Sequence, residues 1–472
     1  MFHKKAIFIN TASQVVVRFI TLAFTLVSIK LLSNYLGPTG LGNFNTITTY
    51  INFFIVIADL GLFAVAVREI SKTPENEKKI LSNVFFIRLI SAMIACVLAG
   101  GIVFLTKYES DIKYGVLIAC GFLFFNLLAS VYDMLMQYRL KMQYSALAEF
   151  IGKLGNVLVL YLIIRLQGNF LWIMSTVAMW GISLFILKWA FSTKFQKFGV
   201  SYDREVSSWI FRMAWPLGFV FIVNNLFFKL DTLLLFAIKG AAEVGIYSVA
   251  YKILEVTAFI GSFFASALKP SFAENIEANK ERLKSIVEKS ISIMVFISMP
   301  IAIACLVFSK EIVVFLSNDQ FVSGGPALVL LAFTLPFIYL VTLLSEILIA
   351  NDSRKTMVKI SVFILLFNLI ANLYFIPKYS FMGAAFTTLV SEIILVAIYF
   401  RYTRKLVGYC IDWKFIIKNI LISMVTIAIG YVIKSPNVYF IFSLAITLAV
   451  YFLLSQITKL ASIASIKKLI RS

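Results

Sequence analysis

Long apolar segments follow one another along almost the whole chain and constrain its fold more than any other feature. A helix needs roughly 20 apolar residues to cross the hydrocarbon core of a bilayer. The chain is 61% hydrophobic and 14% charged, whereas soluble domains are about 45–50% apolar and about 25% charged. We therefore predict an all-α integral membrane protein of about 14 transmembrane helices, with spans near residues 8–33, 43–67, 80–105, 114–136, 146–166, 169–191, 209–237, 244–268, 285–308, 324–350, 356–376, 381–401, 415–433 and 437–457.

Basic residues are distributed unevenly between the two sets of loops. With the N-terminus in the cytoplasm, about thirty Lys and Arg lie on that side, and the other side holds Lys30, Lys107, Lys113, Arg165, Lys239, Lys310, Lys378 and Lys434. Cytoplasmic loops of membrane proteins carry such an excess, so we predict a multi-pass protein of the cell inner membrane with both termini cytoplasmic. A polybasic face toward anionic lipid explains the net charge of +20 without nucleic acid as a partner. No cleavable signal peptide is evident, and we expect the N-terminus to be retained.

Two short turns, some two hundred residues apart, have similar sequences. LGPTGLGNF (residues 36–44) and KGAAEVGIY (residues 239–247) each separate two apolar runs. In this alignment Gly37 matches Gly240, and Gly42 matches Gly245. Paired repeats with sites between them are typical of secondary transporters. We expect both turns to close over a central cavity in an inward-facing state.

The repeat and the loop lengths predict the domain organisation. We expect two pseudo-symmetric six-helix lobes joined by a cytoplasmic linker, followed by a plainer helix pair that packs outside the two-lobed core. The corresponding ranges are 1–191 for the first lobe, 192–208 for the linker, 209–405 for the second lobe, and 406–472 for the extra pair with a basic tail.

Five basic side chains remain inside the predicted spans once those assigned to the loops are set aside: Arg18, Arg88, Lys153, Lys229 and Lys252. A Lys or Arg at the centre of a span costs about 2.5–3.5 kcal/mol, so such residues usually face a wet cavity or a partner. All five are candidate substrate-binding residues. Arg18 and Arg88 lead, because a guanidinium offers a planar fork that matches phosphate oxygens, and two of them in one cavity would suit a diphosphate. The alternative is that each caps carbonyl groups or pairs with Asp59.

Carboxylates also occur inside the spans. Glu392 stands alone near the middle of the twelfth span and is a candidate coupling group for H⁺ or Na⁺, because burial disfavours the charged form of a carboxyl group; an isolated Glu that is simply protonated is the alternative. Three more candidates for ion coupling are Asp59, Asp231 and Glu255. Glu149 can pair with Lys153, four residues later on one helix, and the remaining two, Asp133 and Glu346, are boundary residues near the cytoplasmic interface.

Histidine and cysteine are too sparse to indicate metal or cofactor chemistry. His3 is the single histidine, three cysteines (Cys96, Cys120 and Cys305) fall in apolar runs, and Cys410 lies in a basic loop. None of them has the spacing of metal ligands. We expect neither a metal site nor a cofactor.

Several motifs resemble those of a known family of membrane proteins, the polysaccharide transporters of O-antigen flippase type. This family belongs to the superfamily that includes the multidrug and toxin extruders and the lipid II flippases. The resemblance extends over essentially the whole chain. It rests on YLGPTGLG (Tyr35–Gly42), ADLGL (Ala58–Leu62), VREI (Val67–Ile70), KLDTLLL (Lys229–Leu235) and EVGIYSVAYKILE (Glu243–Glu255).

The resemblance implies a bilobed bundle with a cationic cavity and alternating access, without enzymatic activity. Its expected substrate is an undecaprenyl-diphosphate-linked oligosaccharide that moves to the outer leaflet, coupled to an ion or to the membrane potential. Other glycan-assembly membrane proteins are further expected partners. Asn34 and Thr39 depart from the charged residues common at these positions of the family. Because both side chains are uncharged, these departures argue against an external salt bridge at the turn of residues 36–44.

Two alternatives to a lipid-linked oligosaccharide flippase stay open. A multidrug exporter of the same superfamily would have an acidic cavity and usually twelve spans, whereas this chain has a basic surplus and fourteen predicted spans. A membrane glycan polymerase or ligase would need a substantial external loop with catalytic carboxylates. The external loops here reach only about fifteen residues, which argues against such an enzyme.

Overall fold

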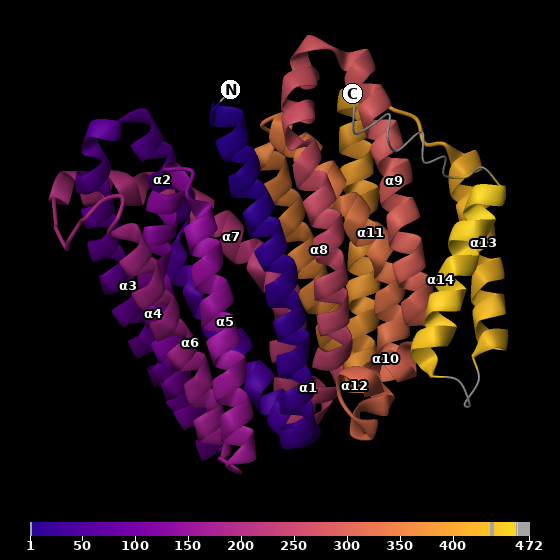
Figure 1. Cartoon of the computed structure of the whole chain (residues 1–472), viewed down its shortest axis with the longest axis horizontal. Coiled ribbons are helices and arrows are strands. Elements are labelled where there is room, and N and C mark those ends of the chain that lie inside the picture. Colours follow the sequence, from indigo (N-terminus) through magenta and orange to yellow (C-terminus); the bar gives the residue numbers. More distant parts are fainter. Residues whose placement is uncertain (1, 435–438, 459, 461–472) are drawn as a thin grey trace. The chain divides into compact units, whose positions relative to one another are not determined.

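The computed structural model describes residues 2–434, 439–458 and 460, and within these all side chains except those of residues 2–13, 216, 217, 220, 221, 224 and 228. The described chain is built of helices joined by short loops and contains no strand (Figure 1). Its elements are α1 (Phe2–Asp59), α2 (Leu62–Lys72), η1 (Pro74–Asn76), α3 (Glu77–Leu105), α4 (Ser110–Tyr138), α5 (Met142–Arg165), α6 (Phe170–Ser192), α7 (Arg204–Lys239), α8 (Ala241–Ala278), α9 (Lys280–Val307), α10 (Ser309–Leu316), η2 (Asp319–Gly324), α11 (Gly325–Ala350), α12 (Arg354–Val407), α13 (Trp413–Ile433) and α14 (Phe440–Ile457).

The described helices account for the predicted membrane spans. Among the described residues, eleven candidate spans are long and apolar enough to cross a bilayer. Two of these candidate spans, in α1 and in α12, each contain two arms of membrane length. The arms meet at a non-helical residue, Gly37 in α1 and Ser380 in α12. A further helix, α7, has 36 residues. The prediction of an all-α multi-pass protein of about 14 spans is therefore confirmed, although residues 437 and 438 of the last predicted span and most of the basic tail lie outside the described residues.

The two similar turns have the same backbone conformation. Gly37, inside α1, has φ 63° and ψ −173°, and Gly240, between α7 and α8, has φ 88° and ψ −177°. This region of backbone space is essentially restricted to glycine. Each glycine thus ends one helix and starts the next, and Pro38 suits the first position of the new helical arm because its φ is already fixed near the helical value.

The chain divides into two compact units, Met1–Gly245 and Ile246–Ser472. In the first unit, α4 packs most extensively on α6 and α3, and α1 packs on α5, α7, α4 and α3. A hydrophobic core joins α2, α3, α4 and the start of α7, with Val84, Met134 and Ile210 fully buried in it. The lobe boundaries predicted at residues 191, 208 and 405 stay a prediction.

The segment between α6 and α7 is held against α3. Asn83 is fully buried, and its side-chain oxygen accepts hydrogen bonds from the Asp203 backbone N–H at 2.6 Å and from the Ser207 hydroxyl at 3.0 Å. Lys79 lies 2.7 Å from the Asp203 carboxylate. Its hydrogen bond holds the pKa of Asp203 below its usual value. The linker is therefore docked on the first unit by polar contacts.

In the second unit, α11 packs between α9 and α12, and α13 and α14 pack on each other and on α9. The fully buried Tyr451 of α14 fixes this pair. Its hydroxyl contacts the Asn419 side-chain oxygen of α13 at 2.8 Å and the Phe296 carbonyl of α9 at 3.2 Å. Two short elements between α9 and α11, namely α10 and η2, were not expected from hydropathy, because each is too short to form a span.

The second predicted span ends earlier than its apolar sequence suggests. Leu60 and Gly61 have φ values of 46° and 75°, so the helix breaks there and α2 begins in a new direction. Gly218 of α7 lies so close that an added Cβ would overlap the Leu60 backbone. The break follows from the ADLGL sequence, where glycine permits the left-handed conformation, and not from any loss of apolar character.

Candidate functional site

The two similar turns meet through their glycines within the first unit. A Cβ added at Gly42 would overlap the carbonyl oxygen of Ala241, and one added at Gly245 would overlap the carbonyl oxygen of Pro38. Small residues allow such close approach of two backbones in membrane helices. Since Pro38 and Ala241 are equivalent in the repeat, the contact is reciprocal. Closure of these turns over a cavity in an inward-facing state stays a prediction.

Arg18 lies on a polar stripe of the first arm of α1. The stripe consists of Gln14, Arg18, Thr21, Thr25 and Ser28, which are separated by four, three, four and three residues and therefore share one face. Arg18 and Gln14 are exposed, whereas the two threonines are half-buried. Thr21 and Thr25 donate hydrogen bonds to carbonyl groups of the preceding turn. Arg18 thus offers its guanidinium at an accessible face of the helix.

Arg88 has a different environment. Its side chain is 1% exposed and forms an ion pair with Asp59, whose side chain is 27% exposed. Asp59 also accepts a 3.3 Å hydrogen bond from the backbone N–H of Gly61, at the break between α1 and α2. The structure therefore favours the alternative in which Arg88 pairs with Asp59, and it does not bring Arg88 to the accessible face that holds Arg18.

Lys153 packs on an aromatic surface. Its ammonium lies 4.8 Å from the centroid of the Trp180 ring on α6, and Trp180 stacks on Phe122 of α4 with centroids 5.0 Å apart. A cation over the face of an indole is stabilised by the ring quadrupole. Lys153 therefore has an aromatic partner, in keeping with the structural role that its position at the mouth of the fifth span allows.

Lys188 of α6 is a buried cation that sequence reasoning missed. Its side chain is only 4% exposed and lies 2.7 Å from Asp133 and 3.6 Å from Glu149. The Ser145 hydroxyl donates a 2.6 Å hydrogen bond to the other oxygen of Asp133. Lys188 stands near the end of a span and therefore looked like one more cytoplasmic lysine. Only the packing of α4, α5 and α6 brings it to two carboxylates.

Lys229 and Asp231 both lie on α7, in the first unit. Asp231 is buried and accepts a 2.7 Å hydrogen bond from the backbone N–H of Thr232, whereas Lys229 is half-buried. Two residues apart, they point about 200° away from each other around the helix. The different burial of the two side chains agrees with this spacing.

Lys252 and Glu255 of α8 form an ion pair in the second unit. Their charged atoms are 2.5 Å apart, and about three tenths of each side chain is exposed. Their spacing of three residues places them on one face of the helix. In the same unit, Lys269 lies 3.4 Å from Glu346 of α11, so the boundary carboxylate Glu346 also has a cationic neighbour.

Glu392 is buried in α12 beside a chain of polar side chains. Asn372 donates a 2.9 Å hydrogen bond to Asn368, which donates one of 3.2 Å to Ser391. One carboxylate oxygen of Glu392, the amide oxygen of Asn372 and the hydroxyl of Thr387 have no hydrogen-bond partner among the described residues. Of these groups, the Glu392 carboxylate could take up a proton or bind a cation. Among the described residues, no group of three or more His, Cys, Asp and Glu is placed to hold a metal ion.

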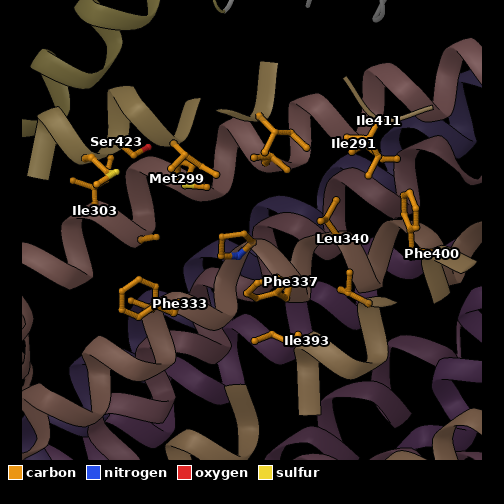
Figure 2. A pocket seen from close by; sticks show the side chains of 18 of the residues that line it. Ile291, Met299, Ile303, Phe333, Phe337, Leu340, Ile393, Phe400, Ile411 and Ser423 are labelled. Atoms are coloured by element: carbon orange, nitrogen blue, oxygen red, sulfur yellow. The ribbon is translucent and has the colours of Figure 1, made fainter. Parts of the chain in front are cut away.

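A large apolar cavity lies in the second unit, between α9, α11, α12 and α13. Its volume is about 750 Å³. Figure 2 shows side chains from these helices around a common space, among them Met299, Phe333, Phe337 and Ile393. No charged residue lines it, and Ser423 supplies the one side-chain hydroxyl of its wall. The sequence did not reveal this cavity, because α13 belongs to the helix pair that looked plain.

Comparison with known families identifies two that match large parts of the chain. The polysaccharide biosynthesis protein family matches residues 7–276, and the lipid II flippase MurJ family matches residues 201–455. The capsular polysaccharide biosynthesis protein CapF of Staphylococcus aureus is 26% identical over a region covering 46% of this chain and 56% of that protein. The match therefore spans about half the length of this curated relative.

Solved structures share the fold over nearly the whole chain. A lipid II flippase MurJ in an inward closed conformation has a TM-score of 0.81 at 16% identity, covering 94% of this chain and 98% of that one. An inward-facing multidrug resistance transporter of the MATE family has a TM-score of 0.64 at 15% identity, covering 82% of this chain and 94% of that one. These likenesses show the fold, and the family match over residues 7–276, more than half of the chain, shows that the chain belongs to the polysaccharide biosynthesis protein family.

Proposed function

We propose that this protein is a flippase that moves a lipid-linked oligosaccharide, carried on undecaprenyl diphosphate, from the cytoplasmic to the outer leaflet by alternating access. The observation that carries the proposal is the apolar cavity formed by α9, α11, α12 and α13. A polar headgroup cannot cross hydrocarbon unaided, so a transporter of such a lipid needs a place for the tail besides a polar path for the head.

The chemistry of the cavity wall suits a polyprenyl chain. Such a chain has no hydrogen-bonding groups and gains from the burial of apolar surface, and the wall is made of aliphatic and aromatic side chains. A small cationic drug would instead need a carboxylate or another acceptor to replace its hydration. Export of such molecules, as in the MATE transporters that share the fold, is the second candidate, but the basic surplus of the chain does not favour it.

Basic side chains would hold the diphosphate. Arg18 and Lys229 of the first unit and Lys252 of the second are each, taken singly, candidates for this role, because Arg18 is exposed and the two lysines are half-buried inside spans. Arg88 is a weaker candidate because its side chain is only 1% exposed and is paired with Asp59, and Lys153 because its ammonium lies over the Trp180 ring. Lys252 pairs with Glu255, but about three tenths of its side chain stays exposed. A planar guanidinium or an ammonium forms charge-assisted hydrogen bonds with phosphate oxygens, and the protein then needs no chemical reaction of its own.

Glu392 is our proposed coupling residue for H⁺ or Na⁺. It is buried, and one of its oxygens accepts no hydrogen bond from the part of the chain that the structure describes. Asp59, Asp231 and Glu255 are secondary candidates, because Asp59 and Glu255 are engaged by Arg88 and Lys252 and Asp231 by the backbone. We place the protein in the cytoplasmic membrane with both termini inside the cell, where it would receive an O-antigen, capsule or related glycan from other assembly proteins.

A leaflet-resolved assay tests this function. Purified protein in liposomes is given undecaprenyl diphosphate bearing a labelled disaccharide, under a proton or sodium gradient. The wild type should transfer the lipid between leaflets, and Ala397→Phe should slow transfer because Ala397 is an exposed residue of the cavity wall. Val425→Phe, at an exposed position of α13 outside the wall, is the matched control. A wild type without transfer would refute the proposed function, and equal rates for both variants would refute the role of the cavity.

A further inference from the structure

The second arm of α1 carries a row of polar side chains on one face. Asn45, Thr48, Asn52 and Asp59 are separated by three, four and seven residues. At about 100° per residue, the four positions fall within an arc of about 60° around the helix. A row of this kind inside a membrane-spanning helix indicates one face that is not meant for lipid.

The opposite face of the same arm is packed against its neighbours. Ile47, Ile51 and Phe54 are buried, and Ile47 reaches Gly115 of α4. The hydroxyl of Tyr50 donates a 2.9 Å hydrogen bond to the carbonyl oxygen of Ala99 on α3. Asn45, Thr48 and Asn52 therefore lie on the side of α1 away from these contacts with α3 and α4, whereas Asp59, at the end of the row, pairs with Arg88 of α3.

Asn52 is exposed although it lies deep in the span. It follows Gly42 by ten residues, which is about 15 Å along the helix and about half of a hydrocarbon core of roughly 30 Å. A short amide side chain cannot reach the interface from this depth, as a lysine can. An exposed amide at mid-depth is tolerated where it meets water or a polar ligand.

The hydrogen bonds of the row leave acceptors facing outward. The Asn52 amide N–H donates to the Thr48 carbonyl at 2.8 Å, and the Thr48 hydroxyl donates to the Phe44 carbonyl at 3.0 Å. The side-chain oxygens of Asn52 and Thr48 thus keep lone pairs for an incoming donor. No formal charge occurs between Gly42 and Asp59. A neutral row of acceptors suits hydroxyl donors, whereas a diphosphate needs cations or donors.

We infer that Asn45, Thr48 and Asn52 form a track that binds sugar hydroxyls of the glycan headgroup during its passage. This inference rests on the proposed function, because it assigns the sugar part of the same substrate to α1. It separates the recognition of the glycan, by neutral amides and hydroxyls, from that of the diphosphate, by basic side chains. The track would therefore set the preference for a lipid that carries a glycan over one that does not.

The test compares two probes with the same tail: undecaprenyl diphosphate bearing a labelled disaccharide, and labelled undecaprenyl diphosphate without sugar. The readout is the ratio of their transfer rates at low probe concentration. Asn52→Leu and Thr48→Val should each lower this ratio about 2- to 10-fold, the range for one lost hydrogen bond. Transfer of the sugar-free probe should stay unchanged, which also shows that each variant is folded.

Two further variants sharpen the comparison. Asn52→Gln should keep most of the wild-type ratio, because it retains the amide. Thr46→Val is the matched control, since Thr46 is buried on the packed side of the same arm, and its ratio should equal that of the wild type. A wild type that transfers neither probe would overturn the proposed function and this inference together. A wild type that transfers the glycan probe, with an unchanged ratio in both Asn52→Leu and Thr48→Val, would overturn this inference alone.

Discussion

The ion pair between Arg88 and Asp59 makes a quantitative prediction about stability. Breaking a buried ion pair by removing one partner costs about 3–5 kcal/mol, because the other charge stays buried without compensation. Arg88→Met leaves Asp59, which is 27% exposed and keeps the N–H of Gly61 as a donor, so we expect the lower end, about 3 kcal/mol. Asp59→Asn leaves a guanidinium that is 1% exposed, and we expect the upper end, about 5 kcal/mol.

Thermal unfolding in detergent, followed by the fraction that elutes as folded protein, measures these costs. A change of 1 kcal/mol shifts the midpoint by about 2–4 °C in a unit of this size, so Arg88→Met should lose about 6–12 °C and Asp59→Asn about 10–20 °C. The double variant should lose clearly less than the sum of the two, since neither charge is then left alone. Arg18→Met is the control, because an exposed side chain should change the midpoint by no more than about 2 °C.

Transport by the same variants separates the two arginines. Arg18→Met should lose transfer of the lipid-linked glycan while the protein stays folded, as expected of a residue that meets the diphosphate. For Arg88→Met, the transfer rate per amount of folded protein should equal that of the wild type. A variant Arg88→Met with the midpoint of the wild type and no transport would refute the reasoning, because it would place Arg88 at the substrate and not at Asp59. Strictly additive midpoint shifts would refute the coupling of the pair.

Further predictions concern the turns, the coupling carboxyl and the linker. Gly42→Ala should separate the two similar turns and lower the yield of a crosslink between cysteines placed at Thr39 and Ala242; wild-type turns that never crosslink in an inward-facing state would contradict their closure. Glu392→Gln should remove the dependence of transport on a proton or sodium gradient, and an unchanged dependence would exclude Glu392. Because a lysine of α3 holds the pKa of Asp203 below its usual value, the contact of the linker should persist above about pH 4 and be lost as the pH falls further. Hydrogen exchange of the linker amides should show this loss, and pH-independent protection would contradict it.

The number of spans was predictable from the sequence because the bilayer sets the length of an apolar helix. The bends were predictable in part. Gly37 and Gly240 mark their turns in the sequence, and both adopt the glycine-specific conformation. The break at Leu60 and Gly61 was not predicted, since the apolar run continues through it and hydropathy does not depend on backbone direction.

Contacts between helices account for what the sequence could not supply. Lys252 and Glu255 lie on one helix, so their spacing already places them together. Lys188 of α6 meets Asp133 of α4, 55 residues away in the sequence, and no local pattern indicates that pairing. The same holds for the apolar cavity, whose wall combines residues of four helices. A pattern of apolar residues cannot distinguish a side chain that faces lipid from one that lines such a space.

The reciprocal contact of the two turns gives a physical reason for their similar sequences. Any side chain at Gly42 would strike the backbone at Ala241, and any side chain at Gly245 would strike the backbone at Pro38. In such a reciprocal contact, Gly42 meets Ala241, the equivalent of Pro38, and Gly245 meets Pro38 itself. A change in one turn therefore alters the space available to the other. The two glycines are therefore constrained together. We expect Gly42→Ala and Gly245→Ala to have similar effects on crosslinking, and the double variant to cost less than the sum of the two, because the first methyl already separates the turns. Additive effects would mean that the two glycines serve separate contacts.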